Sequence, residues 1–183
     1  EIVERAKSHD ILTPVMLAVF AGLRRGEIYT LAWNDIDLDG SWINVRKEHT
    51  KSKKRRSVPI PTILHEYLAN ISPGTGNVVN SPETTLTHRF KKLRSELSFR
   101  DALSVATLRF HDLRHAFAQG LRDAGVILDD IQSFMGHSSV QVTERRYAQS
   151  GGYGAADKVA RLAAVTSSGL TITCSWVRGW PRW

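Results

Sequence analysis

The feature that most limits the possible folds is one pair of strand-like segments set among segments with helical spacing. Residues 42–45 alternate apolar and polar side chains, and residues 56–60 form a returning strand after a polar, lysine-rich stretch. The pair predicts a β-hairpin with a basic tip at residues 49–55. Because the surrounding segments have helical character, we expect an α+β fold that is mainly α-helical, with a small antiparallel β-sheet or hairpin at one edge.

The expected helices have ordinary start and stop signals. Thr13 followed by Pro14 is a capping residue and a first-turn proline, and Gly22 ends the apolar run that follows. A second short helix is expected at residues 25–31, and Pro61 starts another. Further helices are expected at residues 86–97, 111–124, 127–134, 140–147 and 155–164.

Charge narrows the class of partner. The 183-residue chain has a formal net charge of +7, which favours nucleic acid or an acidic membrane surface, although a merely soluble basic protein would also carry it. No apolar run reaches the roughly 20 residues that span a bilayer, so no membrane role is expected. The lone cysteine, Cys174, excludes an internal disulfide and favours a reducing compartment such as the cytoplasm.

Arg24 is the first candidate functional residue. Gly22 and Gly26 on either side give the backbone freedom to approach a ligand closely. Alone, an arginine after the end of a helix is usually a solvated charge that the helix dipole favours. Glu27 lies one helical turn further on and could hold Arg24 in a salt bridge.

The segment His-Asp-Leu-Arg-His at residues 111–115 is more specific. On a helix, His111, Arg114 and His115 share a face that offers one permanent cation and two titratable imidazoles. The spacing of the two histidines also permits zinc, but the zinc hydrolase pattern needs a glutamate where Asp112 stands, and no cysteine lies nearby. We therefore expect no metal, and a packed, hydrogen-bonded structural role for His115.

A further basic segment begins at Gly136 and ends at Tyr147, which taken alone would be a half-buried packing residue. In combination the candidate residues have a chemical meaning. Two arginines can fork onto one phosphate, a lysine and two histidines can move or stabilise protons, and a tyrosine hydroxyl can attack phosphorus. The residues that would supply these groups are Arg24, Arg114, Lys51, His111, His137 and Tyr147.

Residues 13–149 together resemble the tyrosine recombinase family, the phage integrases and their relatives. The resemblance rests on five segments: Gly22-Leu23-Arg24-Arg25-Gly26-Glu27 with Leu31, Trp33 and Asp35-Ile36-Asp37; Thr50-Lys51-Ser52 with Arg56 and Val58-Pro59; His111-Asp112-Leu113-Arg114-His115; Gly136-His137-Ser138; and Arg146-Tyr147.

The resemblance implies a role for each candidate. Arg24 and Arg114 would bind the scissile phosphate, with Glu27 at the family's supporting acidic position. Lys51 would be the hairpin lysine that protonates the leaving 5′-oxygen, although Lys47, Lys53 and Lys54 lie in or beside the same hairpin. His111 would accept the phenolic proton, His137 would hydrogen-bond the phosphate, and Tyr147 would be the nucleophile.

The implied activity is site-specific DNA recombination of the integrase type. Strands would be cleaved and rejoined through a covalent 3′-phosphotyrosine intermediate, without a metal, another cofactor or ATP. A type IB topoisomerase or a telomere resolvase would use the same chemistry. A non-catalytic DNA-binding module would explain the charge equally well. The hypothesis requires the guanidinium groups of Arg24 and Arg114 to lie close together.

The implied partner is double-stranded DNA, bound in a bacterial or phage context in the cytoplasm, at the nucleoid. We expect residues 1–165 to form the catalytic domain and the Trp-rich tail, 166–183, to dock in cis or in trans. The chain begins without Met, which suggests a fragment that lacks an N-terminal core-binding domain. A homo-oligomer is expected, tetrameric on DNA and weak or monomeric when isolated. The expected DNA-contacting residues are Arg25, Lys53, Lys54, Arg55, Lys91 and Lys92.

Overall fold

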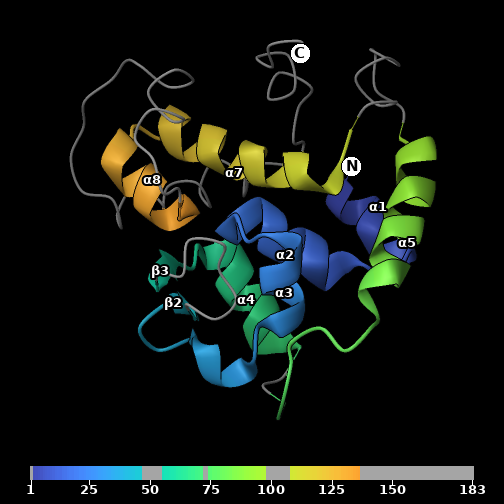
Figure 1. Cartoon of the computed structure of the whole chain (residues 1–183), viewed down its shortest axis with the longest axis horizontal. Helices are drawn as coiled ribbons and strands as arrows, with labels where there is room; N and C mark the ends of the chain where they lie inside the picture. Colours follow the sequence, from blue (N-terminus) through green and yellow to red (C-terminus); the bar gives the residue numbers. More distant parts are fainter. Residues whose placement is uncertain (1, 47–54, 72–73, 98–107, 137–183) are drawn as a thin grey trace.

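In the computed structural model, residues 2–46, 55–71, 74–97 and 108–136 are described, and they form a mainly helical body with a small antiparallel sheet at one edge (Figure 1). The expected fold class is therefore confirmed for this part of the chain. The helices are α1 Ile2–Ser8, α2 Leu12–Ala21, α3 Arg25–Thr30, the 3₁₀ helix η1 Trp33–Asp35, α4 Thr62–Asn70, α5 Glu83–Ser95, α7 Phe110–Asp123 and α8 Leu128–Met135.

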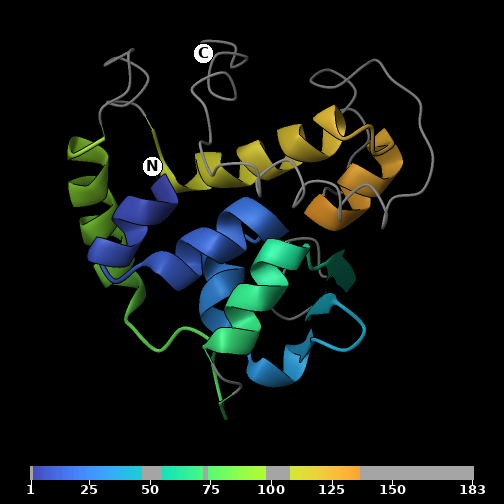
Figure 2. The ribbon, with the colours of Figure 1, turned by 180° about the vertical axis from the view of Figure 1, so that it is seen from behind.

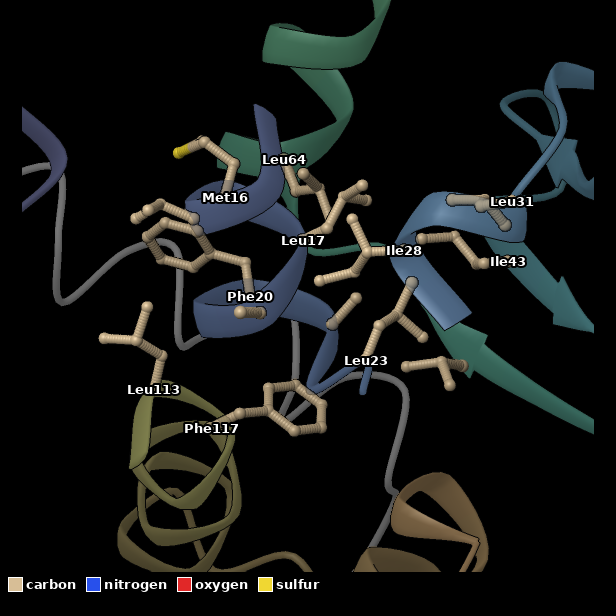
Figure 3. Packing of buried hydrophobic residues seen from close by; sticks show 14 of the residues in the cluster. Met16, Leu17, Phe20, Leu23, Ile28, Leu31, Ile43, Leu64, Leu113 and Phe117 are labelled. Carbon is tan, nitrogen blue, oxygen red and sulfur yellow. The ribbon is translucent and has the colours of Figure 1, made fainter. Parts of the chain in front are cut away.

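Helix α2 lies at the centre of the core. It is apolar nearly all round, so it has no polar face to turn toward solvent. Helix α7 packs across it, and α1, α3 and α4 contact its other sides (Figures 1 and 2). Figure 3 shows Leu64 of α4 on one side of α2 and Phe117 of α7 on the other. Each such fully buried side chain contributes about 1.5–3 kcal/mol to folding.

The start and the end of α2 are determined by different features of the sequence. The prediction that Thr13 caps its start is wrong, because Ile11 is the N-cap residue. The Thr13 hydroxyl instead lies 2.6 Å from the Tyr67 hydroxyl and links α2 to α4. Gly22 ends α2 as predicted, with a φ of 60° in the left-handed region. A side chain there would also overlap the ring of Phe117, so glycine permits both the turn and the close packing of α7.

The sheet confirms the predicted pair of strands and adds a third. Strand β2, Trp42–Val45, pairs antiparallel with β3, Arg56–Pro59, in a register that places Ile43 opposite Val58. Strand β1, Ile36–Asp37, pairs with the outer side of β2 and was not expected from the sequence. A two-residue strand is too short to show an alternating pattern. Most of the predicted basic tip, residues 49–54, lies outside the described residues.

The later helices follow the sequence expectation closely. Helix α5 begins at Glu83, three residues before the expected start at 86. Helices α7 and α8 match their expected ranges within about one residue, and Gly136 ends α8 with a φ of 59°. Helix α8 packs beside β3, so the strand that leaves the hairpin contacts the helix that precedes residue 137 (Figure 1). The helices expected at 140–147 and 155–164, and the tail, lie outside the described residues.

Among the helices of the described ranges, none combines the length and the apolar character that crossing a membrane requires.

Candidate functional site

A buried carboxylate, Glu27, lies at the centre of the candidate site. Its side chain is 1% exposed and sits in the first turn of α3. Arg56 of β3 binds both of its oxygens, with Nη1 donating to Oε1 at 2.9 Å and Nη2 donating to Oε2 at 2.6 Å. The parallel pair of bonds is the geometry in which a guanidinium binds a carboxylate most strongly.

Arg24 binds the same carboxylate from the segment that precedes α3. Its Nη1 donates to Glu27 Oε1 at 2.8 Å, and its backbone N–H donates to Glu27 Oε2 at 2.8 Å. The salt bridge expected between these two residues is therefore confirmed. The Arg24 side chain is 21% exposed, so it remains partly accessible to solvent.

Arg114 reaches the cluster from α7, on the other side of α2. Its Nη1 lies 3.9 Å from Glu27 Oε2 and donates to the Gly22 carbonyl, and its Nη2 donates to the Met135 carbonyl. Arg114 is 1% exposed. The proximity of Arg24 and Arg114, which the sequence hypothesis required, is confirmed because both approach one carboxylate.

The carboxyl end of α8 gathers the same three arginines. Phe134 O accepts from Arg56 Nε at 2.8 Å, Met135 O accepts from Arg114, and Gly136 O accepts from Arg24 Nη2 at 3.1 Å. The last carbonyls of a helix have no partner within the helix and carry partial negative charge. Three consecutive carbonyls are therefore satisfied by three cations that come from distant parts of the sequence.

The cluster holds Glu27 in its ionised form. Burial alone would raise the pKa of the Glu27 carboxyl, but the hydrogen bonds and charge of Arg56, together with the hydrogen bonds from Arg24, outweigh burial and lower that pKa from 4.5 to about 2. Three arginines around one carboxylate carry a net positive charge. Such an arrangement can accept a further anion.

An open groove of about 620 Å³ runs from Arg24 along α5 and the start of α7. Its floor is apolar and includes Phe90 and Phe110, whose rings meet edge to face at 5.4 Å. At its rim, Arg25 forms a salt bridge of 2.5 Å with Glu83. The arginines, lysine and histidine that line the groove are Arg24, Arg25, Lys91, Arg94, Arg109 and His111.

The two histidines of α7 lie together at its start. The rings of His111 and His115 meet edge to face at 5.1 Å, as residues on one helical face should. His111 is exposed and lines the groove, whereas Arg114, which was expected on the same face, is turned into the core. Asp112 accepts the backbone N–H of Arg109 at 2.6 Å and so caps the first turn of α7.

Metal ligation was the alternative reading of these histidines. Within the described ranges, no three His, Cys, Asp or Glu side chains form a group that could hold a metal ion.

The other predicted residues fall into two groups. Arg55 is exposed just before β3, and Lys91 and Lys92 are exposed on α5, where Lys91 lines the groove. The remaining predicted residues lie outside the described residues, and these are Lys51, Lys53, Lys54, His137 and Tyr147.

Arg56 is the site residue that the sequence reasoning did not select, although it belongs to the segments quoted above. Its side chain is only 5% exposed and it holds the central carboxylate. The signal was present in the period of the strand, because Arg56 and Val58 point to the buried face while Ser57 between them is exposed. A charged residue at an inward position of a strand needs a buried partner.

Comparison with known proteins identifies the family. The model of the phage integrase family matches residues 2–151. Tyrosine recombinase XerA of Thermococcus kodakarensis is 33% identical over 143 residues, which cover 71% of this chain and 48% of the relative. The chain spans about half the length of the curated relatives it matches.

Two solved structures share the fold. The Tn1549 transposon integrase, in complex with transposon right end DNA, has a TM-score of 0.65 and 19% identity, over 88% of this chain and 63% of that one. The catalytic domain of the bacteriophage HP1 integrase has a TM-score of 0.58 and 22% identity, over 91% of this chain and 89% of that one. Because the family model covers most of its residues, the chain belongs to the phage integrase family.

Proposed function

We propose that this chain is the catalytic domain of a site-specific DNA recombinase. It would cleave and rejoin DNA strands through a covalent 3′-phosphotyrosine intermediate formed by Tyr147. One observation carries the proposal. Arg24 and Arg114 are separated by about half of the sequence, yet both guanidiniums approach Glu27, in a chain that belongs to the phage integrase family.

The chemistry explains why two arginines are needed. When a phenolic oxygen adds to a phosphodiester, negative charge grows on the nonbridging oxygens. Guanidiniums placed where that charge develops stabilise the transition state more than the ground state. In the proposed reaction Arg24, which lines the groove and is partly exposed, binds the phosphate oxygens. Arg114, which is buried and donates to the Gly22 and Met135 carbonyls, adds its positive charge to the site, and Glu27 orients both arginines.

The remaining steps concern protons. Phenol has a pKa of about 10, so an acceptor and nearby positive charge are needed to activate Tyr147. In this proposal His111 accepts that proton, His137 hydrogen-bonds the phosphate, and Lys51 protonates the leaving 5′-oxygen. The product keeps the energy of the phosphodiester bond, so a 5′-hydroxyl from another strand can reverse the attack without ATP.

The proposed partner is double-stranded DNA, bound along the basic groove. The groove lies beside Arg24 and has basic residues from α5 and α7 on its rim, which suits a phosphate backbone. The Tn1549 integrase of the same fold is in complex with DNA. Assembly into a homo-oligomer on DNA, a separate core-binding domain and docking of the tail, residues 166–183, remain predictions.

A covalent capture experiment tests the proposal. The chain is incubated with nicked duplexes tiled across the DNA that flanks its gene, and denaturing gels are searched for a protein–DNA adduct. An adduct should form with at least one duplex, and Tyr147→Phe should abolish it. Tyr153→Phe removes a hydroxyl six residues further along and should leave the adduct intact.

Other results would favour the alternatives. Relaxation of supercoiled DNA without sequence preference would indicate a type IB topoisomerase. DNA binding that is equal in the wild type and Tyr147→Phe, with no adduct on any duplex, would indicate a non-catalytic DNA-binding module.

A second pair of variants tests the guanidinium itself. Arg24→Lys should slow adduct formation by about 100-fold, the scale of losing one donor to a developing oxyanion. Arg5→Lys makes the same change at an exposed position of α1 that does not line the groove and should have little effect on the rate. Equal effects of both variants would contradict the role given to Arg24.

A further inference from the structure

We infer that Arg56 is a positioning residue for the reaction, which acts through Glu27 and the end of α8 and does not contact DNA. The inference rests on the proposed function. In this role Arg56 neutralises and orients the Glu27 carboxylate, which holds Arg24 and lies near Arg114. The positive charges of Arg24 and Arg114 therefore remain available to the phosphate.

The geometry of Arg56 uses the whole guanidinium plane. Nη1 and Nη2 donate to the two oxygens of Glu27 at 2.9 and 2.6 Å, and Nε donates to Phe134 O at 2.8 Å. These three bonds fix the side chain between α3 and α8. With a side chain that is 5% exposed, Arg56 is shielded from the surface on which DNA would lie.

Charge gives the second argument. If Glu27 were paired only with Arg24 and Arg114, its negative charge would cancel part of theirs, and each would be held as the counter-ion of a buried acid. Arg56 makes the closest ion pair with Glu27, at 2.6 Å, whereas the Arg114 approach is 3.9 Å. Arg56 is therefore the principal counter-ion of Glu27. Arg24 is held to the same carboxylate but remains partly exposed at the groove.

Arg56 also links the segments that lead to the other proposed reactive groups. It begins β3, the strand that follows the hairpin containing Lys51 in the sequence. Its Nε donates to the Phe134 carbonyl in the last turn of α8, and only Gly136 separates the end of this helix from His137 in the sequence. Gly136 packs directly on Arg56, because a Cβ at Gly136 would lie 3.0 Å from Arg56 Cδ. The Arg56 side chain thus connects its own strand, β3, to α3 through Glu27 and to α8 through Phe134.

A lysine cannot reproduce this arrangement. An ammonium group would keep the charge, but it lacks the flat fork that binds two carboxylate oxygens while a third nitrogen reaches a carbonyl. Arg56→Lys therefore keeps the charge but loses the geometry, whereas Arg56→Gln loses both. We expect Arg56→Lys to slow the reaction less than Arg56→Gln does.

The experiment compares these variants in the full chain, using the nicked duplex that gives an adduct with the wild type. Adduct formation at saturating DNA should slow at least about tenfold in Arg56→Gln, within the roughly 100-fold that a 1 Å misplacement causes, and less in Arg56→Lys. DNA affinity should not change. Carboxyl NMR should show that the pKa of Glu27, about 2 in the wild type, rises in Arg56→Gln.

Arg46→Gln is the matched control. Arg46 directly follows β2, the other strand of the hairpin, and it also pairs with an acid, Asp35 at 2.5 Å. Its side chain is 49% exposed, however, and its partner is not Glu27. Its adduct rate should equal that of the wild type. The inference is overturned if Arg56→Gln reacts at the wild-type rate. It is also overturned if Arg56→Gln reacts more slowly only because it binds DNA more weakly.

Loss of folding is handled by a double variant. If Arg56→Gln does not fold, Glu27→Gln/Arg56→Gln removes both members of the Arg56–Glu27 ion pair and should fold but react slowly. A wild-type rate in this double variant overturns the inference. A wild type that gives no adduct on any duplex contradicts the proposed function itself and removes the reaction that Arg56 would support. If the wild type gives an adduct and Arg56→Gln forms it at the same rate, only the positioning role of Arg56 is overturned and the proposed function stands.

Discussion

Arg56 and Glu27 form a buried ion pair in which Nη1 meets Oε1 at 2.9 Å and Nη2 meets Oε2 at 2.6 Å. The pair joins the first residue of β3 to the first turn of α3. Arg24 and Arg114 are arranged around it, from the segment before α3 and from α7. The site therefore depends on a charge balance within the core as well as on the residues that face the groove.

Removing the Glu27 charge should destabilise the protein at neutral pH. Glu27→Gln leaves the buried guanidinium of Arg56 without its counter-ion, and breaking a buried pair on one side costs about 3–5 kcal/mol. Urea denaturation followed by circular dichroism measures the free energy of unfolding. Glu66→Gln, at an exposed position of α4, should change it by less than about 0.5 kcal/mol. Similar values for both variants would contradict the central place of Glu27.

The Glu27 carboxyl should make the free energy of unfolding fall as the solution becomes acidic. The pKa of Glu27 is about 2 in the folded protein against 4.5 as the ordinary value. The stabilisation is fully present above pH 4.5 and is lost as the pH falls toward 2, by about 3 kcal/mol. Unfolding measured along this range should show the loss in the wild type, while Glu27→Gln should lack this component. Parallel pH profiles would count against the prediction.

Gly136→Ala should disturb the end of α8. A side chain at a φ of 59° is strained, and the added Cβ would lie 3.0 Å from Arg56 Cδ. We expect a loss of about 1–2 kcal/mol in thermal unfolding, together with slower adduct formation. Gly26→Ala is the control, because nothing lies within 4 Å of its Cβ and alanine favours the helix by about 0.5–1 kcal/mol. Equal stability of the two variants would contradict the prediction.

Neutralising Glu83 should tighten DNA binding. Glu83 pairs with Arg25 at 2.5 Å on the rim of the groove, so it competes with phosphate for that arginine. In Glu83→Gln, fluorescence anisotropy with duplex DNA should give a higher affinity, and the slope of log affinity against log salt should steepen by up to about 1. Glu66→Gln makes the same charge change on α4, which does not line the groove. If both variants gain equally, general charge explains the effect.

Lys91 and Lys92 should differ as DNA contacts. Both are exposed on α5, but only Lys91 lines the groove. Lys91→Gln should reduce the salt slope of DNA binding by about 1, as expected for the loss of one phosphate contact. Lys92→Gln should reduce it less. Identical slopes for the two variants would show that DNA does not follow the groove.

Local pattern was enough for most of the helices and for the strand pair. The alternation in β2 and β3, Gly22 and Gly136 at helix ends, and the apolar run of α2 each reflect forces that act within a few residues. Thr13 shows the limit of such patterns. It has the composition of a cap, yet its hydroxyl binds Tyr67 on another helix, a contact that no local rule contains.

The candidate site divides in the same way. The sequence pointed to Arg24, Glu27, His111 and Arg114, and the family resemblance assigned their roles, because residue types at these spacings suit phosphate chemistry. It could not indicate that Arg56 is the main counter-ion of Glu27, or that Arg114 is buried against the Gly22 and Met135 carbonyls. Those facts arise when α2, α7, α8 and β3 pack together, since a buried charge takes the partners that the assembled core brings within hydrogen-bond distance.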